Sequence, residues 1–577
     1  MKRQDERPWR TLDPFRGKMF SESWPTLVEL FDITCKRFPT RPCFRQFVPE
    51  DWTVNFTEAK AHITGIANFI LSHPDIEKGD RLAVSGKNSV EWALCYLAIL
   101  YAGCVVVPLD AAMKPHELEH FMKFAGVKGA FVDKEKIKNL SDDMKASLDF
   151  TLSLTKNGKE AYVLEHEIDG EQYKDAPRAS LKDTAAILFT SGTTGIPKGV
   201  MLSHENIVTD TFYAQVYMPV DCNDVWYAIL PIHHAYTMVA VFMEGISTGA
   251  EVVFGKRLVV KQLFKELEQG DVTMFLAVPM LFNKLLSGLM DGIKKKSKVA
   301  YYFVRLGMSF SGGVKKLTGK NIGRKMFGGL LKNIALDKNR VCICGGGPLP
   351  SSTFKMYNQL GIDFVQGYGL TEASPITHLN PVDAYKESSV GKIFPTLEQK
   401  IVNADDEGNG LLLIKGSVVM QGYYHNEEAT REILSEDGWL NTGDVGHLDK
   451  EGYFFITGRQ RNIIVTDGGK NVFPEEIEDY FQLYGEIDQI CVCSYLKDKQ
   501  MKIEGIRAIV HPSAEVSESC KNDKEVEDTI RAVIQLVNKE LISYKKIEKL
   551  VISKHPLPET STKKIKRFEV AKIFKEQ

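Results

Sequence analysis

The sequence predicts an α/β protein in which mainly parallel sheets are covered by helices. Helical and strand patterns alternate between residues 57 and 135 and again between residues 205 and 285. Such alternation is typical of parallel sheets, because each crossover between parallel strands needs a helix-length connection. The chain has 577 residues, which is more than one hydrophobic core usually holds, so at least two domains are expected.

The first alternating stretch divides into six elements. Helices are expected at 57–71, 89–101 and 115–124, and strands at 81–85, 104–108 and 129–132. An earlier helix is expected near 24–31, and a later strand at 224–230. Residues 141–180 are polar and are predicted to link this unit to the next strand.

One stretch has the length of a membrane span, since residues 92–109 carry no charge. Gly103 divides it into a helical pattern and a β-branched strand pattern, so we expect a buried helix followed by a strand of an α/β core instead. The first residues are charged and lead into no apolar run, which indicates that there is no signal peptide. A cytoplasmic protein is expected.

The composition excludes several classes of protein. Hydrophobic residues make up 44% of the chain and charged residues 26%, which argues against extensive disorder. The formal net charge of -2 gives no reason to expect a nucleic-acid partner. Ten cysteines show no spacing typical of a metal site, so reduced cysteines in the core are expected.

The most informative segment follows a short apolar run at 185–189 that is typical of a buried strand. It reads Thr190-Ser191-Gly192-Thr193-Thr194-Gly195-Ile196-Pro197-Lys198-Gly199. Glycines leave backbone N–H groups open, hydroxyls add donors and a lysine adds positive charge, so this loop can cradle phosphate. Pro197 stands where a Walker A motif needs its second glycine, which excludes that motif. The alternative is a plain surface turn.

Two further glycine turns follow apolar runs. The first is Gly345-Gly346-Gly347, where backbone without Cβ atoms can lie against a flat ligand. The second is Gly367-Tyr368-Gly369-Leu370-Thr371-Glu372. Its tyrosine can stack on adenine, and Glu372 offers the hard oxygen ligand that Mg²⁺ prefers.

Asp444 follows a third glycine turn, in the segment Asn441-Thr442-Gly443-Asp444. A carboxylate in this position can accept hydrogen bonds from both ribose hydroxyls, as in other nucleotide-binding folds. On its own, an aspartate beside a glycine would more often be a turn former.

These segments together resemble the signature of the adenylate-forming superfamily, which includes acyl- and aryl-CoA synthetases, peptide-synthetase adenylation domains and beetle luciferases. The resemblance spans nearly the whole chain, because later segments match in the family's order. It implies a large N-terminal domain at residues 1–460 that binds ATP and the acyl group, and a small mobile α+β domain at residues 461–577. Arg461 lies where the family has its hinge, although Asp or Lys is usual there.

The resemblance also implies a set of site residues. Catalytic roles are implied for Thr190, Lys198, His234 and Lys564. ATP contacts are implied for Ser191, Gly192, Thr193, Thr194, Gly195, Gly346, Gly347, Gly367, Tyr368, Thr371, Asp444 and Arg459. Thr190 and Glu372 are implied as Mg²⁺ ligands.

The assignments of Lys564 and His234 depend on the residues next to them in the sequence. Counting back from Ile565 selects Lys564 as the catalytic lysine, but Lys563 replaces the family's glycine, so the choice between the two lysines stays open. His234 would shape the acyl pocket and shield the adenylate, and its pairing with His233 has no spacing typical of a metal site. In the second half of the reaction, Gly468-Gly469 would face the ligand.

The implied activity joins a carboxylic acid to AMP from ATP and then transfers the acyl group to CoA. A medium- to long-chain fatty acid is favoured, because Tyr423-Tyr424 and the segment 561–567 look like those of the long-chain ligases. The alternatives are transfer to acyl carrier protein, an aryl or short-chain acid ligase, and a luciferase-like oxygenase. Some related ligases are homodimers, and the sequence leaves both oligomeric state and acyl chain length open.

The stretch 294–340 has an unusual charge. It holds thirteen Lys or Arg against one acid, Asp337, with Phe303, Phe310, Met326, Phe327 and Leu330 among the cations. A solvated face is the ordinary interpretation of such a run. The apolar residues also allow a helix on a membrane surface, and the positive charge would suit an acidic carrier protein.

Overall fold

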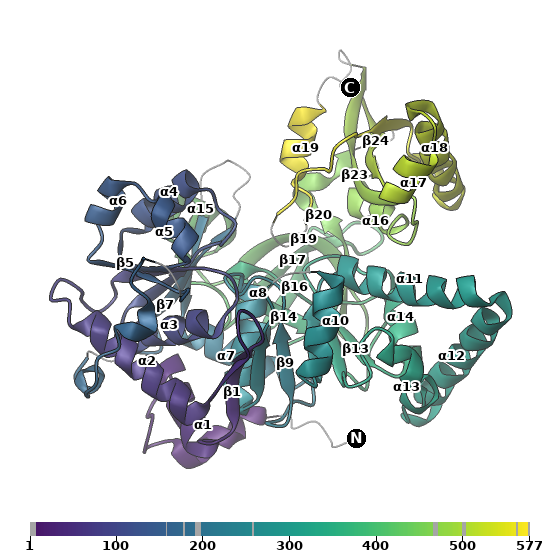
Figure 1. Ribbon diagram of the computed structural model, residues 1–577. Helices are drawn as coiled ribbons and strands as arrows, with labels where there is room; N and C mark the ends of the chain where they lie inside the picture. Colours follow the sequence, from purple (N-terminus) through teal and green to yellow (C-terminus); the bar gives the residue numbers. More distant parts are fainter. Residues whose placement is uncertain are drawn as a thin grey trace.

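The protein is described from a computed structural model that covers residues 7–156, 159–176, 179–190, 198–256, 259–465, 471–498, 503–560 and 564–574. Two large sheets with their helices form most of the molecule, and a smaller lobe at the C-terminal end lies to one side of them (Figure 1). This arrangement confirms the expected α/β fold with mainly parallel sheets and an additional α+β part. Within the described ranges, none of the helices combines the length and the apolar character needed to cross a membrane.

The first sheet is parallel at its centre and antiparallel at one edge. Strands β4, β3, β5, β6 and β7 pair in parallel, whereas β8 and β18 pair antiparallel. The strand order is β18 (Gly422–Tyr423), β8 (Lys198–Ser203), β7 (Thr184–Thr190), β4 (Val105–Pro108), β3 (Arg81–Ser85), β5 (Val127–Val132) and β6 (Phe150–Ser153).

Alternate residues of this sheet face two different layers of helices. Leu82 and Val84 on β3 belong to the main hydrophobic core, together with residues of α2 (Phe56–Leu71) and α3 (Val90–Tyr101). Ala83 between them belongs to a second core cluster with residues of α4 (Pro115–Ala125). Both faces of the sheet are therefore buried, which explains why these strands are continuous apolar runs in the sequence.

Local capping signals set where the first helices begin. Asn55 accepts a hydrogen bond from the Glu58 amide at 2.9 Å, and Glu58 accepts one from the Asn55 amide at 2.9 Å. Thr26 and Glu29 form the same reciprocal pair at the start of α1 (Leu27–Arg37). Such a capping box satisfies two of the amides that a helix start leaves unpaired.

The second sheet joins a parallel half to an antiparallel half. Its strand order is β16 (Glu398–Val402), β17 (Gly410–Lys415), β19 (Leu440–Leu448), β20 (Tyr453–Arg459), β15 (Gly391–Ile393), β14 (Ile376–Leu379), β13 (Asp363–Gly369), β12 (Val341–Cys344), β11 (Met274–Ala277), β9 (Val225–Ala228), β10 (Glu251–Phe254), β1 (Pro42–Gln46) and β2 (Trp52–Asn55). The run from β1 to β13 is parallel, and the run from β13 to β16 is antiparallel.

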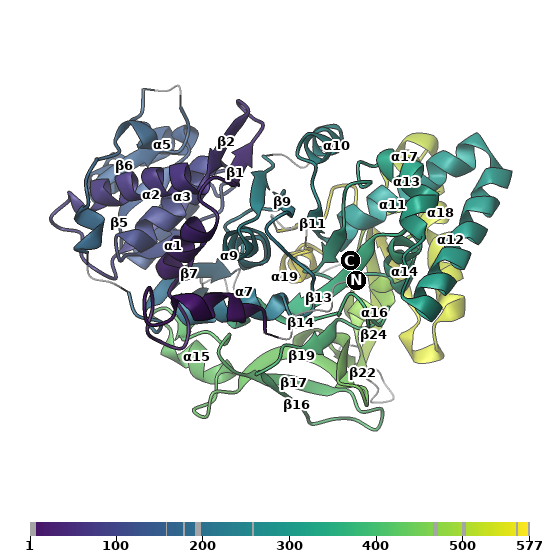
Figure 2. The same ribbon diagram turned by 90° about the horizontal axis from the view of Figure 1, so that it is seen from below.

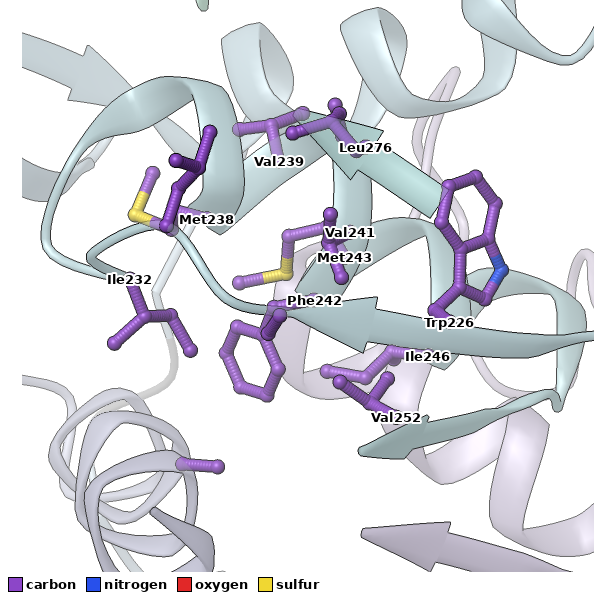
Figure 3. Packing of buried hydrophobic residues seen from close by; sticks show 14 of the residues in the cluster. Trp226, Ile232, Met238, Val239, Val241, Phe242, Met243, Ile246, Val252 and Leu276 are labelled. Carbon is purple, nitrogen blue, oxygen red and sulfur yellow. The ribbon is translucent and has the colours of Figure 1, made fainter. Parts of the chain in front are cut away.

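The main core is densest where the parallel half of the second sheet meets a continuous helical segment. That segment consists of α8 (Ala235–Thr237), the π-helical η4 (Met238–Met243) and α9 (Glu244–Thr248). Figure 3 shows Ile246 of this segment beside Val252 on β10, with Trp226 on β9 and Leu276 on β11 in the same cluster. All four side chains belong to the main core cluster, so the loop before α8 is held against a rigid base.

Four helices lie between β11 and β13 along the chain, on one side of the molecule. They are α11 (Pro279–Lys296), α12 (Lys298–Thr318), α13 (Gly323–Lys332) and α14 (Ser351–Leu360). Figures 1 and 2, which differ by a quarter turn, both place α12 at the outer edge of the molecule. We call α11, α12 and α13 the helical arm.

The smaller lobe has hydrophobic clusters of its own. One cluster runs from Ile464 to Ile547, a second joins Cys491 to Phe574, and neither includes a residue of the main core. Its elements are β21 (Ile464–Val465), β22 (Asn471–Val472), α16 (Pro474–Asp479), β23 (Ile487–Asp498), β24 (Ile503–Pro512), α17 (Ala514–Ser519), α18 (Asp523–Glu540), β25 (Lys549–Ile552) and α19 (Arg567–Ile573). We call residues 464–574 the small lobe and the remainder the large lobe.

Most of the expected elements are present, and one expectation is wrong. Helices α2, α3 and α4 and strands β3, β4 and β5 match the predicted alternation, and the uncharged stretch divides into α3 and β4 as expected. The predicted linker at 141–180 instead contributes β6, which adds a parallel edge strand beside β5. Polar residues around a four-residue strand hid it, because an edge strand needs only one buried face.

Candidate active site

The predicted phosphate loop joins two antiparallel strands. Thr190 ends β7 and lies opposite Lys198, which begins β8, and the Thr190 hydroxyl donates to the Lys198 carbonyl at 3.4 Å. The predicted contacts at Ser191, Gly192, Thr193, Thr194 and Gly195 fall outside the described residues. The structure thus describes the two paired strand ends between which the predicted loop lies.

Lys198, Tyr423 and Glu372 form a connected group beside this hairpin. The Lys198 Nζ lies 4.9 Å from the centre of the Tyr423 ring. The Tyr423 hydroxyl donates to Glu372 Oε1 at 2.7 Å. Burial, followed by the nearby Glu372 charge, raises the pKa of Tyr423, so this phenol stays protonated and acts as a donor. Strand β18, which carries Tyr423, pairs with β8 and therefore brings the two segments together.

A second connected group contains Tyr368, Asp444 and Arg459. Asp444 Oδ2 accepts a hydrogen bond from the Tyr368 hydroxyl at 2.6 Å, and its Oδ1 lies 2.9 Å from Arg459 Nε. Asp444 and Arg459 are direct partners in the β19–β20 register. The Asp444 charge raises the pKa of Arg459, and burial raises the pKa of Tyr368. Two predicted nucleotide contacts, Tyr368 on β13 and Arg459 on β20, therefore meet at a third, the carboxylate of Asp444 on β19.

Glycine is required close to this group. The segment Gly367–Gly369 runs beside β14, and a Cβ on Gly369 would lie 1.7 Å from the Pro375 carbonyl oxygen. Thr371 and Glu372 follow at once in the short η5 (Thr371–Ala373). The close approach of these strands therefore sets the position of Glu372 relative to Tyr368.

Lys564 of the small lobe faces the glycine turn of the large lobe. Gly346 has a φ of +81°, and a Cβ built on it would lie 4.0 Å from the Lys564 Cε. Gly347 is the next residue of the same turn. Lys564 is the only one of the two candidate lysines that the structure describes, because Lys563 lies outside the described residues.

The turn that carries Lys564 is closed by backbone hydrogen bonds. The Thr560 amide donates to the Lys564 carbonyl at 2.8 Å, and the Lys564 amide donates to the Thr560 hydroxyl at 3.1 Å. Although its side chain keeps contact with solvent, the protein groups around it lower its pKa to about 8. Desolvation is the main cause, and repulsion from Arg459 adds to it while Asp444 opposes it.

His234 lies on the loop just before α8, next to His233 and Asp110. The two imidazole rings are 4.2 Å apart, and His233 Nε2 lies 3.6 Å from Asp110 Oδ2. Burial, with help from His233, lowers the pKa of His234 to about 3, so its ring is neutral at physiological pH. The ligand atoms of all three side chains lie within 4.8 Å of one another, an arrangement that residue spacing did not predict.

A buried asparagine holds this loop. Asn88 donates to the carbonyls of Ala228 and Leu230 at 2.9 Å each, and it accepts from the Ile232 amide at 3.0 Å. These three bonds connect the segment just before α3 to the end of β9 in the second sheet and to the loop that follows β9. Asn88 therefore positions the His233–His234 loop from a distance of 145 residues along the chain.

Comparison with known proteins identifies the family. A family profile described as "AMP-binding enzyme" matches residues 31–424. The chain belongs to this family. The predicted membership of the adenylate-forming superfamily is thereby confirmed, and so is the expectation of an AMP-forming enzyme of the acyl-CoA synthetase type.

Individual AMP-binding relatives match over most of their length. The mitochondrial medium-chain acyl-CoA ligase ACSF2 of Mus musculus is 27% identical over 94% of this chain and 87% of its own. A long-chain-fatty-acid–CoA ligase of Bacillus subtilis is 26% identical over 81% of this chain and 82% of its own. The crystal structure of ATP-bound MatB from Rhodopseudomonas palustris superposes with a TM-score of 0.75 at 22% identity, over 95% of this chain and 99% of that one.

Sequence reasoning missed three side chains of this AMP-binding enzyme that the structure places beside the predicted residues. Tyr423 drew attention only as a mark of long-chain ligases, whereas Asp110 and Asn88 were not selected. A polar residue directly after a buried strand is the available signal for Asp110, which follows β4. Asn88 has no such signal, because its partners lie about 140 residues away along the chain.

Proposed function

We propose that this enzyme activates a medium- to long-chain fatty acid as its acyl-AMP and then transfers the acyl group to CoA, releasing AMP. The observation that carries the proposal is the position of Lys564, which lies against the glycine turn at Gly346 and within electrostatic reach of Arg459 and Asp444. Relatives named as medium-chain and long-chain acyl-CoA ligases support a fatty acid over other acids. The alternatives are acyl carrier protein as the acceptor and an aryl acid as the substrate.

The first half-reaction brings two anions together. A carboxylate oxygen attacks the α-phosphorus of ATP, a P–O bond to pyrophosphate breaks, and the acid becomes an acyl phosphate anhydride with AMP. Cations are needed at the phosphates, and Lys198 and Lys564 are the residues proposed to supply that charge. The acid is already ionised, so the barrier is lowered by positioning and by charge, and no general base is required.

The remaining groups are proposed to orient the nucleotide. Asp444 keeps free lone pairs besides those used by Tyr368 and Arg459, so it can accept the ribose hydroxyls. Tyr368 offers its ring to adenine. The Glu372 carboxylate and the Thr190 hydroxyl are hard oxygen donors of the kind that Mg²⁺ prefers, and they fit that ion by their chemistry. Mg²⁺ arriving with ATP would neutralise part of the phosphate charge.

The second half-reaction transfers the acyl group to sulfur. The sulfur of CoA attacks the acyl carbon and its proton passes to solvent, the acyl–oxygen bond to AMP breaks, and a thioester and free AMP form. His234, which is proposed to lie beside the acyl group, is neutral. It therefore adds no positive charge that would hold the phosphate of AMP or the sulfur of CoA in place. We propose that the small lobe pivots near Arg461, so that Lys564 withdraws and the thiol gains access.

Acid and acceptor specificity are tested together in one screen. Purified enzyme is given ATP, Mg²⁺ and saturated acids of graded length, with benzoate as the aryl arm, and pyrophosphate release is measured. AMP release is then compared with CoA and with acyl carrier protein as acceptor. We expect the highest kcat/KM with acids of medium to long chain and with CoA. Activity confined to benzoate, or dependent on carrier protein, would replace the proposed substrate or acceptor.

Replacing Asp444 by asparagine should weaken ATP binding. Asparagine keeps the size of the side chain but removes the charge that Arg459 and the ribose hydroxyls are proposed to share. Hydrogen bonds to charged groups contribute about 1.5–3 kcal/mol, so we expect KM for ATP to rise by roughly 10- to 100-fold. The assay is ATP–pyrophosphate exchange at saturating acid.

The control for this substitution is Asp437→Asn. Asp437 is an exposed turn residue on the segment leading to β19. Its variant should keep the KM of the unaltered enzyme. An Asp444→Asn variant with unchanged KM for ATP would remove Asp444 from the nucleotide site.

Adenylation should lose efficiency above about pH 8. The pKa of Lys564 is lowered to about 8, so its charge is present below that pH and is lost as the pH rises. We expect kcat/KM for pyrophosphate release to fall toward tenfold per pH unit on the alkaline side. Lys564→Arg keeps its charge throughout this range, so its profile should lack the limb, whatever its absolute rate. An identical alkaline limb in both proteins would assign the titration to another group.

A further inference from the structure

Helix α12 of the helical arm is apolar on two opposite faces. Its inner face carries Tyr301, Val304, Met308 and Ser311, which recur at spacings of three and four residues. Met308 and Ser311 are buried, and Tyr301 and Val304 pack on the main core. This face binds the helix to the large lobe through α14 and α11. The inner face therefore accounts for the packing of α12 on the large lobe.

The outer face presents large apolar side chains to solvent. Phe303, Leu306 and Phe310 are 70%, 69% and 63% exposed. They recur at three- and four-residue spacings, so they form a stripe along one side of the helix. Further exposed members of the same helix are Val299, Tyr302 and Leu317. A stripe of this length on a protein surface indicates a binding face.

The surroundings of this stripe are strongly basic. Asp337 is the single acid between residues 294 and 340, against thirteen Lys or Arg. Several of these lysines form no ion pair with any carboxylate in the described ranges, namely Lys294, Lys295, Lys296, Lys298, Lys316, Lys320, Lys325 and Lys332. By contrast, Lys315 lies on the buried side and pairs with Asp363 at 2.7 Å. The excess positive charge is thus on the outer part of the arm, beside the apolar stripe.

We propose that the helical arm docks on an anionic lipid bilayer, with the Phe303–Leu306–Phe310 stripe inserted at the headgroup level and the lysines on lipid phosphates. Apolar side chains flanked by lysines are the pattern of helices that lie in the plane of a membrane interface. Both views of the molecule place α12 at its outer edge, where a flat surface can reach it (Figures 1 and 2). A second copy of this arm would bring like charges together, which disfavours self-association through the same face.

The proposal is tested by vesicle co-sedimentation of the full-length protein without ATP or acid, so the result does not depend on the proposed activity. Vesicles of phosphatidylcholine alone are compared with vesicles containing about one-third phosphatidylserine, at low and high salt. We expect binding to the anionic vesicles, weakened by salt. The variant Phe303→Ser/Leu306→Ser/Phe310→Ser should lose at least tenfold in partitioning. Its folding is checked by thermal unfolding, which exposed positions should leave unchanged.

A matched variant separates the stripe from general surface hydrophobicity. Leu536→Ser/Phe568→Ser/Ile573→Ser removes three exposed apolar side chains from the small lobe and should bind vesicles like the unaltered protein. Failure of the unaltered protein to bind anionic vesicles would overturn the proposal, as would equal binding by the stripe variant. A stripe variant that changed only from dimer to monomer in analytical ultracentrifugation would assign the face to a second copy, which also overturns it.

Discussion

Lys564→Ala should reduce acyl-adenylate formation by about 100- to 1,000-fold, the range found when one preorganised donor to a developing charge is removed. Lys564 reaches the glycine turn at Gly346 from the small lobe and carries a positive charge below pH 8. Without it, the attacking carboxylate and the phosphates of ATP would repel each other. Pyrophosphate release in single turnovers is the direct measurement.

The same variant should keep the second half-reaction. When acyl-AMP is supplied together with CoA, thioester formation should stay within a few-fold of the unaltered enzyme, because the pivot is proposed to withdraw Lys564 from the site. Lys563→Ala is the matched control, and it should leave both halves nearly unchanged. Equal loss of the two halves in Lys564→Ala, or loss of adenylation in Lys563→Ala, would contradict the assignment.

Arg461→Pro should have the opposite effect, with thioester formation reduced by about 100-fold or more and adenylation largely retained. Arg461 lies in the short 3₁₀ turn η6 (Gln460–Asn462) between β20 and β21. The bond that closes this turn runs from the Ile463 amide to the Gln460 carbonyl at 3.4 Å and does not use the Arg461 amide. Proline can therefore fit the conformation described here while preventing φ from changing.

The contacts across the lobes are compatible with such a pivot. Gln482, in the turn after α16, accepts a hydrogen bond from the Asn283 side-chain amide at 3.1 Å and donates one to the Pro348 carbonyl at 3.2 Å. In addition, Lys284 forms an ion pair with Asp488 at 3.4 Å. All three contacts are polar, and those of Gln482 with Pro348 and of Lys284 with Asp488 lie near solvent, where water can replace them. Arg461→Ala, which keeps φ free, is the control and should retain both halves. Normal overall turnover in Arg461→Pro would exclude a pivot at this residue.

The parallel parts of both sheets were predictable because their signal is local. Strands such as β3 and β4 are buried on both faces, so they stand out as apolar runs between helical patterns. The short edge strand β6 was not predicted, and neither was the antiparallel continuation from β14 to β20. Those strands have one exposed face or only a few residues, and their pairing partners are chosen by the assembled sheet.

In the candidate site, too, single residues could be predicted from the sequence, but the contacts between them could not. Tyr368 and Asp444 could be selected because each stands next to glycines after a strand, which is a pattern of neighbouring residues. Their direct hydrogen bond joins residues 76 apart and follows only from the order of the strands. The partnership of Lys198 with Tyr423 likewise depends on β18 pairing with β8.

The sequence by itself determined the family, the alternation of helices and strands, and the types of side chain available for binding ATP. Those properties lie in short segments, where glycine, hydroxyl and charged residues have meaning from their immediate neighbours. Only the tertiary structure decided that Asp444 joins Tyr368 to Arg459, that Asn88 holds the histidine loop, and that α12 turns Phe303 outward. These relations depend on burial and on contacts between distant segments, because packing, and not local order along the chain, determines which faces meet.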